Sequence, residues 1–275
     1  DCEDAFEHAN RLARWHYQWI VLEEFLPTVC DPDVVEDVRS EREYYTVPAG
    51  EEPYIPVEFA GAAYRYGHSQ IRERYRVNET AEAALFGHGD DAFGMGFQAP
   101  SAEEAVDWRY LFELKDPDVT PQRARAIDPL LSPDLLDLPF VEADDWRGSL
   151  ASRNLVRGRR LGLPSGQAVA RAMDVDPLSN EELGFDVILD DHGQHPGTEA
   201  PLWYYVLAES RAASGGDHLG PVGSRIVAET LVGLIESDPT SFRTVQPGWT
   251  PSLPAPNAGA DDFTVADLLT FALDH

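Results

Sequence analysis

The sequence predicts a mainly α-helical protein made of many helices, with long irregular loops and little β-structure. Three observations lead to this fold class. Apolar residues recur at helical spacing, several of the segments that carry this spacing begin or end at a proline, and strand signals are weak. Long stretches rich in Pro, Gly and Asp separate the helices, at residues 87–105, 174–200 and 238–262. Such connections are unusual in a simple helical bundle and favour a core organised around a cofactor.

The individual elements follow from the same signals. The predicted helices cover residues 4–26, 56–74, 107–112, 121–128, 146–160, 165–173, 201–213, 220–237 and 263–273. Pro27 is expected to end the first helix, Pro56 to begin the second, and Pro164 with Ser165 to start the sixth. Residues 43–47 (Glu-Tyr-Tyr-Thr-Val) are expected to pair locally as a strand at most.

Length and charge set the class of protein. With 275 residues, 43% of them hydrophobic, the chain can bury a substantial core, and a single domain over residues 1–275 is expected. There are 49 acidic residues against 21 basic ones, of which only Lys115 is a lysine. The net charge of −28 argues against nucleic acid and anionic membranes as partners. It favours a soluble protein, cytoplasmic or secreted, in a high-salt environment, as in a halophile; the alternative is an ordinary acidic protein.

Residues 59–69 carry the most informative chemistry. His68 and Arg65 lie here among small and aromatic residues. At α-helical spacing one face holds Gly61, Tyr64, Arg65, His68 and Arg72. Gly61 is expected to leave room beside the imidazole, so that the face suits a flat, apolar, anionic cofactor such as haem. The alternative is a core histidine beside a surface arginine.

Two motifs resemble those of a known family. Ala63-Tyr64-Arg65-Tyr66-Gly67-His68-Ser69 resembles the proximal-histidine helix of the animal-type haem peroxidases, in the peroxidase–cyclooxygenase superfamily. Residues 149–164 (Ser-Leu-Ala-Ser-Arg-Asn-Leu-Val-Arg-Gly-Arg-Arg-Leu-Gly-Leu-Pro) resemble the second helix of that family's signature. The resemblance extends from residues 14–21 to residues 219–223 and is greatest to the prokaryotic branch.

This resemblance implies roles for four residues. His68 would be the axial ligand of the iron, and Asn154 would accept a hydrogen bond from the other ring nitrogen. Arg65 and Arg157 would face the propionates of a haem, b-type or modified. An amide accepts more weakly than a carboxylate, so the histidine would stay closer to neutral and the iron's reduction potential would be higher.

The sequence also departs from the family pattern. Members usually have Arg-Asp-His-Gly-Leu-Pro where residues 159–164 read Arg-Arg-Leu-Gly-Leu-Pro. The family places its distal His, Gln, Arg and an Asp that helps bind calcium upstream of the helix that contains Trp15. The chain is therefore expected to be the proximal portion of a longer protein, whose missing distal segment could bind calcium, and no catalytic residue is assigned.

Several functions remain open at this point. The first is a haem peroxidase that uses hydrogen peroxide to oxidise small organic or halide donors. The second is a non-catalytic haem-binding or structural relative of the same fold. A third is a fatty-acid dioxygenase of the superfamily with a radical at Tyr64 or Tyr66.

Other patterns have a structural alternative. Arg153, Arg157, Arg159 and Arg160 form a basic run that either pairs with surface carboxylates or, for Arg157, contacts the cofactor. Residues 190–195 (Asp-Asp-His-Gly-Gln-His) could bind a divalent metal or form a solvated acidic loop. The two cysteines, Cys2 and Cys30, are free thiols or one bridge. Residues 203–205 (Trp-Tyr-Tyr) are interpreted as structural.

Overall fold

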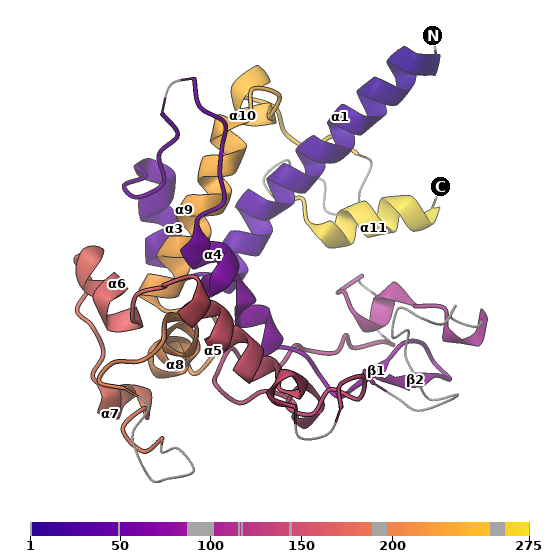
Figure 1. Ribbon diagram of the computed structural model, residues 1–275. Helices are drawn as coiled ribbons and strands as arrows, with labels where there is room; N and C mark the ends of the chain where they lie inside the picture. The colour runs from indigo at the N-terminus through magenta and orange to yellow at the C-terminus, as the bar shows by residue number, and fades with distance from the viewer. Residues whose placement is uncertain are drawn as a thin grey trace. The chain divides into compact units, whose positions relative to one another are not determined.

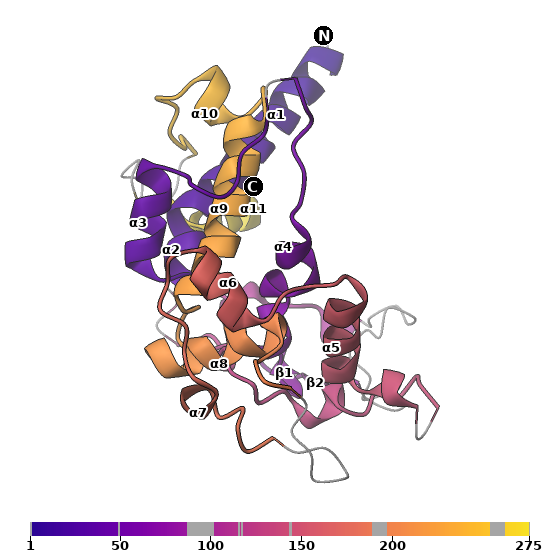
Figure 2. The ribbon, with the colours of Figure 1, turned by 60° about the vertical axis from the view of Figure 1, so that its left-hand side comes forward.

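The computed structural model describes residues 2–48, 50–86, 102–114, 116, 118–142, 145–188, 197–253 and 262–274. They form two compact units, unit 1 (Asp1–Pro56 and Ser224–His275) and unit 2 (Val57–Gly223). The mainly α-helical fold class is confirmed, because the described residues contain many helices and only two short strands (Figures 1 and 2). The single domain over residues 1–275 stays a prediction.

Unit 1 begins with one long helical run that passes through Pro27. Its helices are α1 Cys2–Ile20, a π-helical turn Val21–Phe25, α2 Leu26–Val29, α3 Pro32–Ser40, most of α9 Pro221–Ser237, α10 Phe242–Val245 and α11 Val265–Asp274. The prediction that Pro27 ends the first helix was wrong. In the π-helical turn the Leu26 N–H bonds to the Val21 carbonyl, and this wider turn lies where Pro27 has no N–H to donate.

An aromatic cluster forms part of the core of unit 1. Trp249 meets Trp15, Trp19 and Phe242 with ring centroids 5.4, 6.3 and 5.5 Å apart. All four side chains are buried. Trp15 and Trp19 are four residues apart on α1 and so lie on one face of that helix.

A buried carboxylate binds the backbone of residues 43–45, part of the segment with a weak strand signal. The backbone N–H groups of Glu43, Tyr44 and Tyr45 all donate to Glu229 of α9, at 2.9 to 3.1 Å. The ring of Tyr45 lies against Gly233, where an added Cβ would come within 2.1 Å of it. Residues 43–47 were expected to pair locally as a strand at most, and they do not pair, because these N–H groups bond to a side chain rather than to another strand.

Unit 2 is built around α8. Its helices are α4 Val57–Gly61, α5 Leu150–Arg160, α6 Gly166–Ala172, α7 Asn180–Leu183 and α8 Leu202–Ser214, with short 3-10 helices at Ala63–His68, Ala102–Glu104, Trp108–Tyr110, Pro133–Leu135 and Trp146–Gly148. Helices α5, α6 and α7 all contact α8 (Figures 1 and 2). Tyr205 of α8 is fully buried and fills the space over Gly166, the first residue of α6.

The helix predicted over residues 121–128 was wrong. The described backbone there is irregular, and its N–H groups bond to distant carbonyls. Gln122 donates to Tyr110, Arg125 to Gln70 and Ile127 to Gly216. Tertiary hydrogen bonds thus replace the local ones of a helix.

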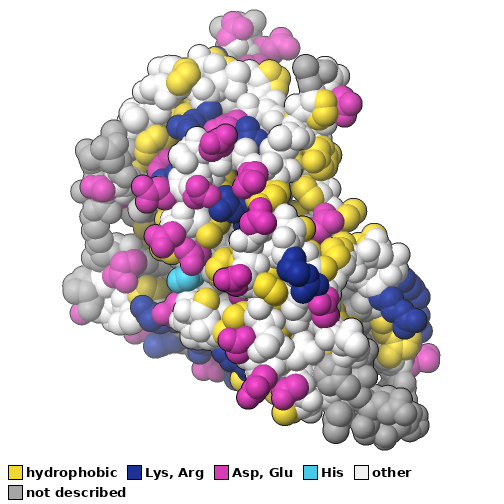
Figure 3. Space-filling view, turned by 90° about the vertical axis from the view of Figure 1, so that its left-hand side faces the viewer, with side chains coloured by type: hydrophobic (Ala, Val, Ile, Leu, Met, Phe, Trp, Pro, Cys, Tyr) yellow, Lys and Arg dark blue, Asp and Glu magenta, His cyan; other side chains and the backbone are white. Residues whose placement is uncertain are grey.

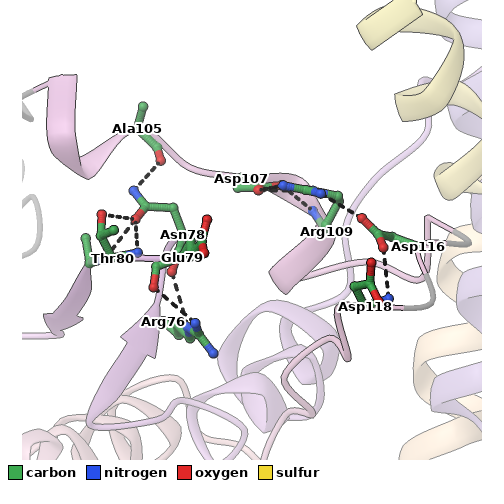
Figure 4. A network of polar contacts seen from close by, with 10 residues as sticks. Arg76, Asn78, Glu79, Thr80, Ala105, Asp107, Arg109, Asp116 and Asp118 are labelled. Carbon is green, nitrogen blue, oxygen red and sulfur yellow. Dashed lines mark hydrogen bonds and ion pairs between the residues drawn. The ribbon is translucent and has the colours of Figure 1, made fainter.

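A small hairpin and a charged network lie between α4 and α5 in the sequence. Strands β1 Arg74–Arg76 and β2 Glu82–Ala84 pair antiparallel, with Tyr75 opposite Ala83. In Figure 4 the Asn78 amide joins the hairpin loop to the Ala105 carbonyl, and Arg109 lies between Asp107 and Asp116. Figure 3 shows acidic side chains spread over the visible face, with smaller groups of basic ones between them.

Candidate cofactor site

The segment that carries His68 changes helix type on the way to it. As predicted, a helix begins after Pro56, but α4 ends at Gly61, and Ala62 leaves the helical region with φ −138° and ψ −72°. The chain continues as the 3-10 helix Ala63–His68. Three residues per turn place Arg65 directly in line with His68, so these two side chains share one edge. The single helix predicted over residues 56–74 was therefore wrong beyond Gly61.

Helix α5 carries the second motif and ends in a tight cap. The Ser149 side chain accepts from the N–H of Ser152 at the start of the helix. At its end Gly162 has a φ of +68°, and Leu163 N–H bonds back to the Gly158 carbonyl at 3.0 Å. This is a Schellman motif, in which glycine adopts the left-handed conformation at least cost. The cap turns Leu163 back toward α4.

The space over Gly61 is filled by leucines. A Cβ placed on Gly61 would lie 2.8 Å from Leu161 Cδ1 and 3.2 Å from Leu163 Cδ1. The prediction that Gly61 leaves room beside the imidazole was wrong, since Gly61 instead lets α4 and the end of α5 approach closely. Gly67, next to His68, has open space instead, because a Cβ added there meets nothing within 4 Å.

His68 and Asn154, 86 residues apart in the sequence, meet in unit 2. Asn154 Nδ2 lies 2.9 Å from His68 Nδ1, and the Asn154 side chain is 1% exposed. An amide can face the ring in two orientations. With Nδ2 toward the ring it donates to an unprotonated Nδ1; with Oδ1 toward the ring it accepts from Nδ1–H, which leaves the Nε2 lone pair available to a metal.

The surroundings of His68 are cationic. Burial lowers the pKa of His68 below its usual value, and the nearby charges of Arg65 and Arg157 lower it further. Burial also lowers the pKa of Arg65, with a contribution from Arg157. Within the described part of the chain neither arginine forms an ion pair, although Arg65 Nε donates to the Ala60 carbonyl at 2.8 Å. The site therefore combines an imidazole whose neutral form is favoured with two guanidiniums that have no carboxylate within ion-pair distance among the described residues.

Trp203 of α8 supports this turn, although no sequence pattern connects it with the site. Its Nε1 donates to the backbone carbonyl of Arg65 at 3.3 Å, and its side chain is 5% exposed. Tyr66 is buried, and Tyr64 is 42% exposed and stacks on Phe59 with ring centroids 4.4 Å apart. A tryptophan at helical spacing carries no sequence signal for such a contact.

The remaining candidates do not join this group. Arg153 Nε bonds to the Arg147 carbonyl, and Arg159 and Arg160 are exposed. Cys30 is a buried free thiol. Residues 190–195 lie outside the described residues, and the described residues contain no cluster of three or more metal-ligating side chains.

Comparisons with known proteins agree with the two motifs. The family model described as animal haem peroxidase matches residues 1–190, which include His68, Asn154, Arg65 and Arg157. No curated protein matches the chain. Among the described helices, none is both long and apolar enough to cross a membrane.

Proposed function

The chain belongs to the animal haem peroxidase family, and from this premise we propose that it is a haem-dependent, peroxidase-type oxidoreductase in which His68 is the axial ligand of the iron. The observation that carries the proposal is the contact between His68 and Asn154, because it joins the two motifs through the ring nitrogen that the metal would not use. A hydrogen-bond partner on the other ring nitrogen fixes the tautomer and the orientation of a ligating histidine.

The donor set fits a haem. A ligating imidazole must be neutral, and the burial and positive charges around His68 favour the neutral ring. Asn154 holds the Nδ1 side of that ring without taking its proton, since an amide is a weak acceptor compared with a carboxylate. The open space at Gly67 is consistent with a bulky group beside His68.

Arg65 and Arg157 are proposed to hold the propionates. Both contribute positive charge at His68, and Arg65 is positioned through its backbone by Trp203 and through its Nε by Ala60. A guanidinium and a carboxylate form charge-assisted hydrogen bonds, which are about twice as strong as neutral ones. An anionic cofactor would supply the negative charge that the described surroundings do not.

The haem, when bound, supplies the redox chemistry by which hydrogen peroxide is reduced and a small organic or halide donor is oxidised. The residues described above bind and orient the cofactor; no residue of this chain is assigned to proton transfer at the peroxide. That step is proposed to belong to a distal segment, which could also bind calcium. The net charge of −28 supports a high-salt working environment.

A haemin titration tests this proposal. The chain in concentrated KCl is titrated with haemin and followed by optical absorption, alongside H68A, N154A, R157Q and, as a control, H8A, which removes an exposed histidine of α1. We expect saturation at one equivalent with a histidine-ligated spectrum in the wild type and in H8A. H68A should lose that spectrum, N154A should shift it, and R157Q should bind roughly tenfold more weakly.

Binding that is indifferent to His68 would contradict the assignment of the ligand. If haemin binds as expected, the loaded chain is then mixed with hydrogen peroxide and a phenolic donor. Turnover by this chain supports the enzyme and contradicts the assignment of proton transfer to a distal segment. The absence of turnover is what that assignment predicts, for the enzyme and for the non-catalytic haem-binding relative alike.

A further inference from the structure

We propose that unit 2 carries a second anion site, made by Arg72 and Arg125, that binds a small oxyanion such as a phosphate or carboxylate group. The two residues line a pocket of about 400 Å³ together with Glu73 and Arg74. None of these residues belongs to the group around His68 and Asn154.

The charges around this pocket do not balance. Arg74 is paired with Glu82, with Nε 2.7 Å from the carboxylate. Within the described part of the chain neither Arg72 nor Arg125 has a carboxylate within ion-pair distance. Glu73 is exposed and lines the same pocket, so the lining has three guanidiniums and one carboxylate.

Among the described residues, Arg72 and Arg125 lack ion pairs in an acidic chain. The chain has 49 acidic residues, and several of its arginines pair with them. Arg109 bonds to both Asp107 and Asp116, as Figure 4 shows, and Arg171 pairs with Glu199 at 2.7 Å. Arg72 and Arg125 are half-buried and, among the described residues, have no carboxylate within ion-pair distance. In such an acidic chain this indicates a place for an external anion.

Backbone contacts hold both guanidiniums in place. Arg72 Nη1 donates to the Arg123 carbonyl at 2.8 Å, and Arg125 Nη2 donates to the Leu130 carbonyl at 3.0 Å. The N–H of Arg125 also bonds to the Gln70 carbonyl at 3.2 Å, which ties the two segments together. A guanidinium has five N–H donors, so each side chain keeps several for a ligand while its position is fixed.

Arg72 carries one further sign of an incomplete site. Its Nε is buried and has no hydrogen-bond partner among the described residues. A buried donor left without an acceptor is unfavourable. An oxyanion bound at the Nη atoms of the same guanidinium would offset part of that cost electrostatically.

The volume indicates what kind of anion fits. A pocket of about 400 Å³ is larger than one phosphate group needs and falls in the range of small-molecule sites. The lining is charged and the pocket is open to solvent, so the ligand class is a small anion with a phosphate or carboxylate group.

Isothermal titration calorimetry with the full chain at a fixed KCl concentration tests the site. The probes are inorganic phosphate and succinate, which distinguish a phosphate head from a carboxylate head. The variants are R72Q and R125Q, and circular dichroism checks that each is folded. R147Q is the matched control, because Arg147 is an exposed arginine paired only with Asp145 among the described residues. R157Q reports on binding at the His68 site.

We expect one saturable event per chain with at least one probe, unchanged in R147Q and R157Q and weakened roughly tenfold in R125Q and in R72Q. R125Q alone is decisive if R72Q does not fold. The proposal is overturned if neither probe saturates, if R147Q weakens binding as much as R125Q, or if only R157Q does so. The last result would place the anion at the His68 site. Failure of the Arg72–Arg125 site is therefore distinguishable from failure of the proposed haem function.

Discussion

Replacing Asn154 by alanine tests whether its contact with His68 contributes to the free energy of unfolding. The amide is 1% exposed and lies 2.9 Å from His68 Nδ1. A hydrogen bond of this kind contributes about 0.5–1.5 kcal/mol. The ring nitrogen left behind adds the lower part of the usual 1–3 kcal/mol penalty, because His68 is only half-buried and water can reach it. We expect N154A to lower the free energy of unfolding by about 1–3 kcal/mol.

A double-mutant cycle isolates the pair. Urea unfolding of the haem-free wild type, N154A, H68A and the double variant should give a coupling energy of about 0.5–1.5 kcal/mol. The control cycle uses N180A with H68A, because Asn180 bonds to Gln167 and Thr198 and not to His68. Coupling below about 0.3 kcal/mol between His68 and Asn154 would refute the reasoning, since that is the range of independent sites.

Three further outcomes are expected. In thermal melts, G166A should lower the free energy of unfolding by about 1–3 kcal/mol or more, because its Cβ would lie 1.9 Å from a ring atom of the fully buried Tyr205. G67A, where an added Cβ meets nothing within 4 Å, should be nearly neutral in the same measurement. Burial raises the pKa of the Cys30 thiol to about 12. The unfolded chain therefore loses this proton first as the pH rises above about 8.5, and the free energy of unfolding should fall by up to about 1.4 kcal/mol per pH unit from there toward pH 12. Urea midpoints of C30S should show a weaker pH dependence than those of the wild type, and equal dependence would count against this reasoning. Finally, the melting temperature should rise between about 0.1 and 1 M KCl, where the Debye length falls from about 10 to 3 Å; a flat profile would mean that repulsion at a net charge of −28 does not limit stability.

The helices that the sequence predicted best are those whose ends have local causes. The helix predicted over residues 165–173 is confirmed as α6. Its start has a local cause, because the Ser165 side chain caps it by accepting from Ala168 N–H. Those at 201–213, 220–237 and 263–273 are confirmed as α8, α9 and α11 within one or two residues. Apolar periodicity and local capping suffice for these.

The failures have tertiary causes. Residues 43–47 look like a strand, but Glu229, far away in the sequence, takes their N–H groups. Helix α3 was missed, although Asp31 caps it by accepting from Asp33 and Val34 before Pro32 begins the helix. That signal was present in the sequence as Asp followed by Pro.

The same distinction between local and tertiary causes applies to the candidate site. The motifs identified His68 and Asn154, and the structure places them in contact; the role of each toward a haem stays a prediction. The sequence did not indicate that Ala62 breaks the helix, that two leucines cover Gly61, or that Trp203 holds Arg65. Each of these depends on a neighbour brought in by the fold, which periodicity along one segment does not report.

The extra residue in the π-helical turn at Val21–Phe25 and the proline at position 27 depend on each other, so that a change at one alters the effect of a change at the other. A π turn is equivalent to one residue inserted into an α-helix, and one residue corresponds to a rotation of about 100°. The direction in which Trp15 and Trp19 point from α1, relative to α2, is therefore set by that extra residue. Deleting one residue from the π-helical turn would rotate the indoles of Trp15 and Trp19 away from Trp249. It would also restore a regular α-helix around Pro27, and an α-helix does not accommodate a proline ring in its interior. P27A should relieve the part of the deletion's cost that comes from the proline ring but not the lost indole contacts. We therefore expect the two changes together to be less damaging than the sum of their separate effects on urea unfolding, and simple additivity would show that the wide turn and the proline are independent.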